Sequence, residues 1–309
     1  MITTLTLNPC IDRSVLIPNL VVGGHNRIIR SRTDLGGKGI NVSVVLHTLG
    51  YTTKTLCMDY MDSGAFLSDS LSLLGLDGSL VTAFGRLREN MKLYDAQTDQ
   101  MTEINEPGAP IDQSTLSRLI QRLDALLPKT DILVLSGSVP PGVENDIYKT
   151  LILRAKTYGV FTVLDAAGEL LRLGIEAKPD LIKPNRFEME MLCGHSLDSL
   201  KQAREDAQAL LDTGVGSVCL SLGKDGAMLL NADGTWYSKG LEIQVKGVQG
   251  AGDSLVAGLC AGHMEHWDSA ETLRTGIALA QGSLLREGTL LCTQEIYEEL
   301  LPKITVEKL

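Results

Sequence analysis

The segment of the chain with the clearest chemical potential runs from Gly250 to Ser254 and reads Gly-Ala-Gly-Asp-Ser. Its small residues let backbone N–H groups approach an anion, and the helix expected after them would present its positive dipole end to a phosphate. Asp253 has two interpretations: a helix N-cap, or a general base that takes a proton from a hydroxyl attacking the phosphate. The two are separable, because asparagine caps a helix as well as aspartate does but cannot act as a base.

A second glycine-rich segment, Leu35-Gly-Gly-Lys-Gly-Ile-Asn-Val42, also precedes an expected helix. It is not a Walker A loop, because the GxxxxGK[ST] spacing is absent, and it lacks the GxGxxG dinucleotide pattern. One interpretation is a tight turn from strand to helix. The favoured one is a grip on a polyhydroxylated or phosphorylated ligand by backbone N–H groups near Gly37, together with Lys38 and Asn41.

Polar residues follow the apolar pair Leu181-Ile182, which is expected to end a buried strand. Open α/β sheets bind ligands at the carboxyl edge of their strands, so these residues are candidates for a nucleotide site. Lys183 could approach the phosphates of the nucleotide. Asn185 and Glu188 could position Mg²⁺ through its bound waters.

Three further loops follow expected strands. Ser221-Leu-Gly-Lys-Asp-Gly226 suits a hairpin turn, and a turn is compatible with nucleotide contacts from Ser221, Gly223 and Gly226. The loop 136–142 is rich in serine, glycine and proline and includes Ser138. In the loop 8–12, Asp12 is either a turn residue or an acceptor for sugar hydroxyls.

Four basic residues, Arg27, Lys38, Arg88 and Lys92, lie in or near these segments. A lone Arg or Lys is usually a solvated surface charge. If the four converge, they form a pocket for a phosphate carried by the acceptor.

The elements that must position these residues alternate along the chain. Several short runs are apolar throughout, which is typical of strands buried on both faces of a parallel sheet. The predicted strands cover residues 3–7, 54–58, 131–135, 161–164, 180–182 and 217–222, and the predicted helices cover 40–49, 113–127, 145–158, 200–212 and 254–266. This alternation predicts a layered α/β fold with a mostly parallel central sheet and helices on both faces.

Two regions, about 13–33 and 87–104, lack a long helix and contain alternating, strand-like stretches. We expect them to form a small β lid that projects from the main sheet. No repeat or linker divides the chain, so residues 1–309 are predicted to form a single domain with this lid.

The bulk composition excludes several classes of protein. The chain has 309 residues and a net charge of −10, which disfavours nucleic acid or an anionic membrane as the main partner. The six cysteines form no CxxC pair, so neither a zinc knuckle nor a redox dithiol is predicted. The N-terminus does not resemble a signal peptide, and no apolar run has the length of a membrane span. We expect a cytoplasmic protein.

Taken together, the motifs resemble those of the ribokinase-like sugar kinases and occur in the same order. The resemblance is greatest to the phosphosugar branch, which contains 1-phosphofructokinases, tagatose-6-phosphate kinases and the minor 6-phosphofructokinases. The residues that carry it are Leu7 to Pro9 with Asp12, Gly36 to Val42, Ser136 to Ser138, Lys183 to Asn185 with Glu188, Ser221 to Gly223, and Gly250 to Ser254.

This resemblance implies a ribokinase-like α/β/α core with a β lid, ATP and Mg²⁺ as cofactors, and a homodimer formed through the lid. Asp253 would be the base, and Gly250, Ala251 and Gly252 would form the anion hole. The family pattern places the remaining site residues in three groups: Lys183, Asn185, Ser221, Gly223, Gly226 and Gly252 near the nucleotide, Asn185 and Glu188 near the metal, and Asp12, Arg27, Gly37, Lys38, Asn41, Arg88, Asn90, Lys92 and Ser138 near the phosphorylated sugar.

The segment Arg88-Glu-Asn-Met-Lys92 resembles the 1-phosphofructokinase pattern, and alternate residues of a strand share one face. Fructose 1-phosphate is therefore the expected acceptor, with tagatose 6-phosphate and fructose 6-phosphate as alternatives. An unphosphorylated-sugar or nucleoside kinase and a non-catalytic sugar-phosphate sensor are further alternatives. Gln249 and Asp165-Ala-Ala-Gly168 depart from the usual family pattern.

Overall fold

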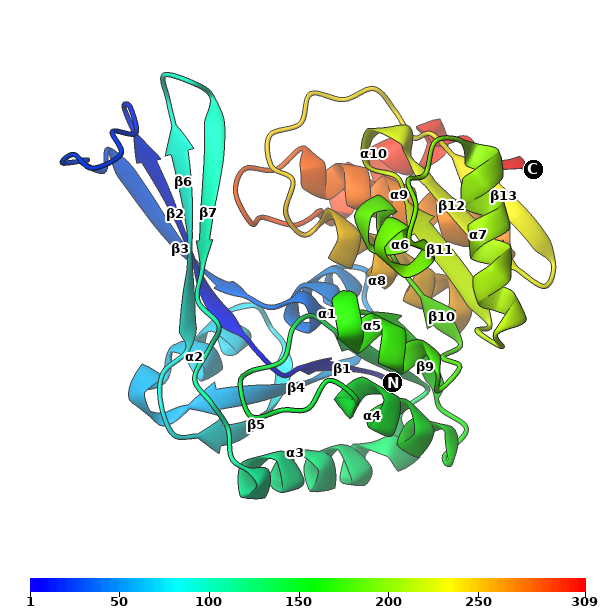
Figure 1. Ribbon diagram of the computed structural model, residues 1–309, viewed down its shortest axis with the longest axis horizontal. Coiled ribbons are helices and arrows are strands. Elements are labelled where there is room, and N and C mark those ends of the chain that lie inside the picture. Colours follow the sequence, from blue (N-terminus) through cyan, green and yellow to red (C-terminus); the bar gives the residue numbers. More distant parts are fainter.

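A ten-stranded sheet forms the centre of the computed structural model, which describes residues 1–309 (Figure 1). The strand order is β14-β13-β12-β11-β10-β9-β8-β1-β4-β5. The seven strands from β11 to β5 are mutually parallel, and β12 to β14 are antiparallel additions at one edge. The strands are β1 (Ile2–Thr6), β4 (Thr53–Tyr60), β5 (Asp77–Ala83), β8 (Ile132–Ser136), β9 (Phe161–Asp165), β10 (Leu181–Ile182), β11 (Ser217–Ser221), β12 (Ala227–Asn231), β13 (Gly234–Ser238) and β14 (Glu307–Lys308).

Helices cover both faces of this sheet and create two separate hydrophobic cores. One core packs α2 (Phe66–Leu73), α3 (Gln113–Leu126), α4 (Ile147–Lys156), α5 (Gly168–Ile175), α6 (Arg186–Cys193) and α7 (Leu200–Asp212) against one face. The other packs α1 (Lys38–Thr48), α8 (Ala251–Met264), α9 (Ser269–Leu284) and α10 (Gln294–Leu300) against the opposite face. The predicted three-layer α/β/α architecture is confirmed. None of these helices is both long and apolar enough to cross a membrane.

The central parallel strands explain why the apolar runs of the sequence were informative. Every residue of β1 and of β8 is buried, as expected for strands covered on both faces. All six predicted strands are present, with ends that differ by one or two residues. The edge strand β5, the antiparallel strands β12 to β14 and the helices α2, α5, α6, α9 and α10 were not predicted.

The helix α8 is held in the interior by a very close contact with α9. A Cβ atom at Gly258 would lie 2.5 Å from the Cα of Gly276, so two glycines allow the helix backbones to approach each other. Leu255, Val256 and Leu259 of α8 are buried in the same core. This packing fixes the first turn of α8, which carries the Gly-Ala-Gly-Asp motif.

A second sheet of four strands stands beside the main body (Figure 1). Its order is β3-β2-β6-β7, formed by β2 (Cys10–Ile17), β3 (Arg30–Gly36), β6 (Arg88–Asp95) and β7 (Gln100–Asn105). Its strands fall in the two regions for which a projecting β structure was expected. Its role as a lid stays a prediction.

Candidate active site

The Gly-Ala-Gly-Asp motif forms the first turn of α8. Gly250 is the N-cap with φ of 73°, a left-handed conformation that favours glycine, and a Cβ there would lie 2.2 Å from Leu291 Cδ2. Asp253 is the third residue of the helix, and no backbone amide donates to its side chain. The N-cap interpretation of Asp253 is therefore wrong, because the helix begins three residues earlier than the predicted start at Ser254.

The carboxylate of Asp253 faces the second glycine-rich segment. It is only 6 % exposed, and Asn41 Nδ2 donates a hydrogen bond to its Oδ2 at 2.7 Å. Burial raises the pKa of Asp253 to about 6, against the lowering effect of Lys38. A carboxyl group with such a pKa is ionised near neutral pH and still basic enough to accept a proton.

Two lysines meet at Asp165, the last residue of β9. Lys38 Nζ and Lys183 Nζ each lie 3.2 Å from Asp165 Oδ1, and Asp165 is completely buried. Burial alone would raise the pKa of Asp165, but the charges of Lys183 and Lys38 outweigh it and lower that pKa. Asp165 thus orients Lys38, the first residue of α1, and Lys183, which follows β10.

Lys183 also lies beside the start of α8. A Cβ at Gly252 would be 3.4 Å from Lys183 Nζ, so the ammonium group and the helix N-terminus are neighbours. The two positive features together form a place for an anion that a side chain at residue 252 would crowd.

A second polar cluster lies on the four-stranded sheet. Lys92 Nζ lies 3.1 Å from Asp12 Oδ2, and Asn90 Nδ2 donates to Asp12 Oδ1 at 3.3 Å. Asp12 and Asn90 are register partners on β2 and β6, so the pairing of these strands sets their contact. A Cβ at Gly36 would lie 2.5 Å from Asp12 Oδ2, which explains the glycine immediately before Gly37.

Arg88, the first residue of β6, is connected to Ser138 by hydrogen bonds through Asn8. Arg88 Nε donates to the Asn8 carbonyl oxygen at 3.1 Å, and Asn8 Nδ2 donates to Ser138 Oγ at 3.2 Å. Asn8 Oδ1 is buried without a hydrogen-bond partner and lies against Gly108, where a Cβ atom would be 2.5 Å from it. Ser138 is exposed at this position, as a ligand contact requires.

Arg27 is the exception among the predicted substrate residues. It is exposed in the connection between β2 and β3, and the paired ends Leu16 and Arg30 separate it from Asp12. Within one chain, the structure does not bring Arg27 to Arg88 and Lys92.

The predicted nucleotide residues lie on adjacent strands. Asn185 forms a parallel bridge with Ser221, which places Lys183 and Asn185 beside the end of β11. Asn185 Oδ1 accepts from the Glu188 amide, and Glu188 Oε2 accepts from the Asn185 amide, each at 2.8 Å, so the pair forms a capping box at the start of α6. Gly223 faces open space at φ of 65°, whereas a Cβ at Gly226 would lie 1.9 Å from the Ser238 carbonyl oxygen. The antiparallel pairing of β11 and β12 confirms the hairpin turn.

The sequence profile of the pfkB carbohydrate kinases matches residues 5–296. The chain belongs to the pfkB family of carbohydrate kinases. It is 32% identical over 309 residues to the 1-phosphofructokinase of Rhodobacter capsulatus, covering 100% of this chain and 98% of that one. It is also 32% identical over 313 residues to the 1-phosphofructokinase of Bacillus subtilis, covering 100% of both chains.

Solved structures agree with this family assignment. The structure of phosphofructokinase-2 from Escherichia coli in complex with potassium matches with a TM-score of 0.91 at 26% identity, covering 98% of each chain. A phosphofructokinase-2 structure in complex with substrates and products matches equally well. The protein is therefore a sugar-phosphate kinase with the ribokinase-like fold, and ATP is its expected phosphoryl donor.

Two residues that contribute to the kinase site were not predicted from the sequence. Asp165 ends a buried apolar strand, and that position at the carboxyl edge of the sheet was the available signal. Gln249 Oε1 contacts Lys92 Nζ, and Gln249 Nε2 donates to Glu103 Oε1 at 3.1 Å. Gln249 thus links the residue before Gly250 to both β6 and β7, which only the fold reveals.

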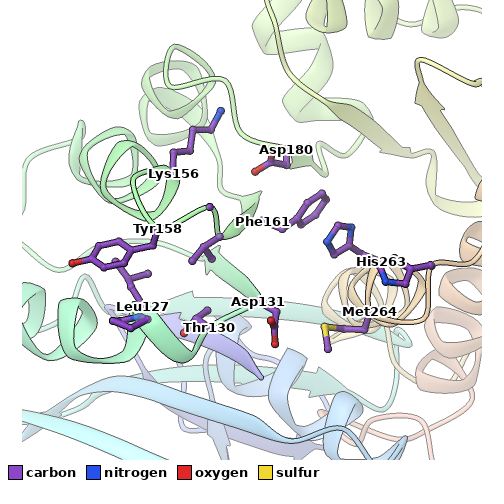
Figure 2. A pocket seen from close by; sticks show the side chains of 13 residues that line it. Leu127, Thr130, Asp131, Lys156, Tyr158, Phe161, Asp180, His263 and Met264 are labelled. Atoms are coloured by element: carbon purple, nitrogen blue, oxygen red, sulfur yellow. The ribbon is translucent and has the colours of Figure 1, made fainter.

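A groove with a volume of about 810 Å³ lies elsewhere on the kinase (Figure 2). Its lining includes Asp131 and Asp180, which precede β8 and β10, and His263, whose ring stacks on Phe161. These positions mark the amino edge of the sheet, and His263 lies roughly 15 Å from Asp253 along α8. The groove is therefore separate from the site that contains Asp253.

Proposed function

We propose that this kinase transfers the γ-phosphoryl group of ATP to fructose 1-phosphate and produces fructose 1,6-bisphosphate. The observation that carries the proposal is the buried Asp253 carboxylate at the N-terminus of α8, held by Asn41 and accompanied by Lys183. It brings together a base, an anion site and the ammonium group of Lys183 at the first turn of α8. The names of the Rhodobacter capsulatus and Bacillus subtilis relatives support the choice of acceptor.

In this proposal the protein positions the reactants and neutralises charge, as in other phosphoryl transfers. The backbone amides of Gly250, Ala251 and Gly252 and the ammonium of Lys183 stabilise the negative charge on the transferring group. Asn41 fixes one oxygen of Asp253, which leaves the other oxygen free for the sugar hydroxyl. Asp253 accepts the proton as the new P–O bond forms, and the bond from the γ-phosphorus to the ADP oxygen breaks.

Nucleotide binding is assigned to the edge formed by β10 and β11. Ser221 and Gly223 lie at the end of β11, and Lys183 and Asn185 follow β10 beside them. Gly226 supports the turn, because any side chain there would collide with the Ser238 carbonyl group. The exposed, left-handed Gly223 leaves the backbone accessible to a nucleotide.

The residues present also fit Mg²⁺, which usually keeps several waters and takes one or two carboxylates. Glu188 is 7 % exposed and uses Oε2 for the Asn185 amide, so its Oε1 is available to a metal-bound water. Asn185 Oδ1 is already an acceptor in the capping box, so Glu188 would be the main holder of the ion and Asn185 would orient it. Mg²⁺ supplies charge neutralisation at the phosphates when bound.

Acceptor binding is assigned to the polar cluster on the four-stranded sheet. Asp12, Asn90 and Lys92 would hold sugar hydroxyls, with Gly37 and Lys38 closing the opposite side. Arg88 and Ser138 would surround the end of the sugar that carries its phosphate and adjacent hydroxyl, and Asn8 would connect them. Fructose 6-phosphate is the second candidate acceptor, because a phosphofructokinase-2 structure in complex with fructose 6-phosphate matches with a TM-score of 0.89 at 26% identity.

The four-stranded sheet is proposed to be a lid and the dimer interface of this cytoplasmic kinase. Val22, Ile29 and Ile104 of this region are 91%, 60% and 55% exposed, which is unusual for large apolar side chains. The lid of a second subunit would cover these side chains. It would also bring a second copy of Arg27 near Arg88 and Lys92. Light scattering should show a dimer that Ile104→Lys converts to a monomer, whereas a monomeric wild type would contradict this assignment.

The acceptor is tested by steady-state kinetics with ATP and three phosphosugars. We expect kcat/KM to be highest for fructose 1-phosphate and lower for fructose 6-phosphate and tagatose 6-phosphate. A preference for one of the other two would replace the proposed substrate and leave the kinase assignment intact. No ADP release with any phosphosugar would instead favour a non-catalytic sensor.

A further inference from the structure

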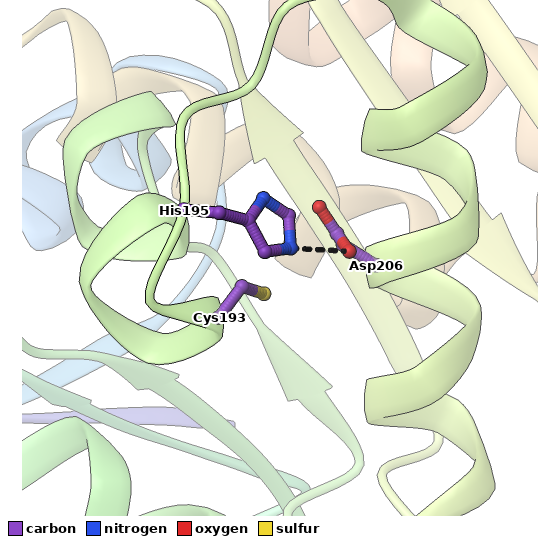
Figure 3. A group of neighbouring side chains, drawn as sticks. All are labelled: Cys193, His195 and Asp206. Atoms are coloured by element: carbon purple, nitrogen blue, oxygen red, sulfur yellow. Dashed lines mark ion pairs between the residues drawn. The ribbon is translucent and has the colours of Figure 1, made fainter.

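Three side chains of the metal-binding type meet at the junction of α6 and α7 (Figure 3). Cys193 is the last residue of α6, His195 follows it by two residues, and Asp206 lies on α7. Their ligand atoms all lie within 4.8 Å of one another, and His195 Nε2 is 3.4 Å from Asp206 Oδ1. Figure 3 shows the thiol, the imidazole ring and the carboxylate pointing toward a common point between the two helices.

The surroundings of Asp206 leave it short of partners. Its Oδ2 atom is buried and accepts no hydrogen bond, although the side chain as a whole is 15% exposed. A buried carboxylate oxygen without a donor is costly, and a cation at this point would satisfy it. Cys193 differs from the five other cysteines, which are all buried, because it is partly accessible to an entering ion.

The imidazole of His195 is arranged so that Nε2 can bind a metal. Its Nδ1 lies 3.1 Å from the Ser196 carbonyl oxygen, to which an Nδ1–H group can donate. A second hydrogen bond of this kind orients most metal-bound histidines. Gln202 Nε2 is also 3.1 Å from Nδ1, so the metal-bound form requires the Gln202 amide to turn its oxygen toward the ring.

We propose that Cys193 Sγ, His195 Nε2 and a carboxylate oxygen of Asp206 bind one Zn²⁺-class transition-metal ion, with water as the fourth ligand. Zinc binds S, N and O ligands in a tetrahedron at about 2.0–2.3 Å, which places ligand atoms about 3.5 Å apart. The three atoms need only small side-chain rotations to reach that spacing. The thiol proton of Cys193 passes to solvent, and the thiolate and carboxylate then neutralise the charge of the ion.

The ion would connect the end of α6 to α7 and fix the loop between them. The Leu197 carbonyl group in that loop accepts a hydrogen bond from Arg186 Nη1 at 2.8 Å, and Arg186 also pairs with Asp225 at 2.8 Å. Asp225 lies in the turn between Gly223 and Gly226. The metal site is therefore coupled by two contacts to the segment assigned to the nucleotide, and it does not itself depend on the identity of the phosphosugar.

Cobalt(II) titration of the metal-free full-length protein tests the site directly. One equivalent of Co²⁺ should produce a thiolate-to-cobalt charge-transfer band and the visible bands of tetrahedral cobalt, and Zn²⁺ should abolish them. Cys193→Ser should remove the charge-transfer band, and Asp206→Asn should weaken binding by roughly tenfold or more. His266→Asn, which changes an exposed histidine outside the cluster, should bind as the wild type does.

A charge-transfer band that persists in Cys193→Ser, or an absence of any band in the wild type, would overturn the proposal. Circular dichroism of each variant shows whether it is folded, and the Zn²⁺-dependent rise in the melting temperature of the wild type gives a second readout. That rise should disappear in Cys193→Ser and in Asp206→Asn. Phosphosugar turnover is measured separately, so a negative metal result leaves the proposed kinase reaction untouched.

Discussion

Replacing Asp253 by asparagine should sharply reduce activity and stabilise the protein at the same time. The pKa of Asp253 rises from 3.8 to about 6 because the carboxylate is buried. A shift of about 2 units corresponds to about 3 kcal/mol that the ionised carboxylate costs the folded state. The cost is absent below pH 3.8, develops as the pH rises to about 6, and is complete above it.

The asparagine side chain at this position would keep the hydrogen bond with Asn41, because its amide oxygen accepts as the carboxylate does, and it would carry no charge. We therefore expect urea denaturation at pH 8 to show a free energy of unfolding up to about 3 kcal/mol higher for Asp253→Asn than for the wild type. The difference should shrink toward pH 4. In the same variant kcat should fall by about 10³-fold, since a general base contributes about 10²–10⁴.

The matched control is Asp165→Asn, where the pKa is lowered and the predicted effect on stability has the opposite sign. Two outcomes would refute the argument. If Asp253→Asn keeps kcat within tenfold of the wild type, Asp253 is not the base. If the variant is less stable than the wild type at pH 8, the carboxylate does not carry the burial cost inferred from its surroundings.

Three further predictions concern the same site. Asp165→Asn should lose about 3 kcal/mol of stability, because it leaves Lys183 buried without its partner, and should raise the KM for ATP in steady-state kinetics. The kcat/KM of the wild type should rise with pH around pH 6, as Asp253 becomes ionised. Asn41→Ala should move that inflection to higher pH, because it removes a hydrogen bond to the ionised carboxylate. An inflection caused by titration of the substrate phosphate would not move in this variant. Arg88→Ala should raise the KM for the phosphosugar by roughly 10–100-fold through the loss of a charged hydrogen bond, with the KM for ATP unchanged; an equal loss with an unphosphorylated sugar would contradict it.

The sequence predicted best what depends on local pattern. The run that became β8, Ile-Leu-Val-Leu-Ser, is almost entirely apolar because both faces of the sheet are covered, and this is visible in the sequence itself. The start of α8 was misplaced by three residues because Gly250, a residue with no capping side chain, begins the helix in a left-handed conformation. Glycine and alanine at the first positions gave no signal of where the helix starts.

The contacts between distant segments could not be predicted. Lys38 and Lys183 are 145 residues apart in the sequence and meet only because β9 brings Asp165 between them. Gln249 was noted as a departure from the family pattern, and only the approach of β6 and β7 to α8 gives it partners. The same limit applies to Cys193, His195 and Asp206, whose spacing matches no CxxC pattern.

The protein has a net charge of −10, yet it can bind two phosphorylated substrates because buried aspartates orient the lysines of the site. Asp165 fixes Lys38 and Lys183, and Asp12 fixes Lys92, each at 3.1–3.2 Å. In each case the lysine is already oriented before a substrate arrives, so little reorganisation remains for the transition state. The buried acids therefore contribute to catalysis by positioning cations, while Asp253, which has no cation within direct contact, keeps the raised pKa that a base needs.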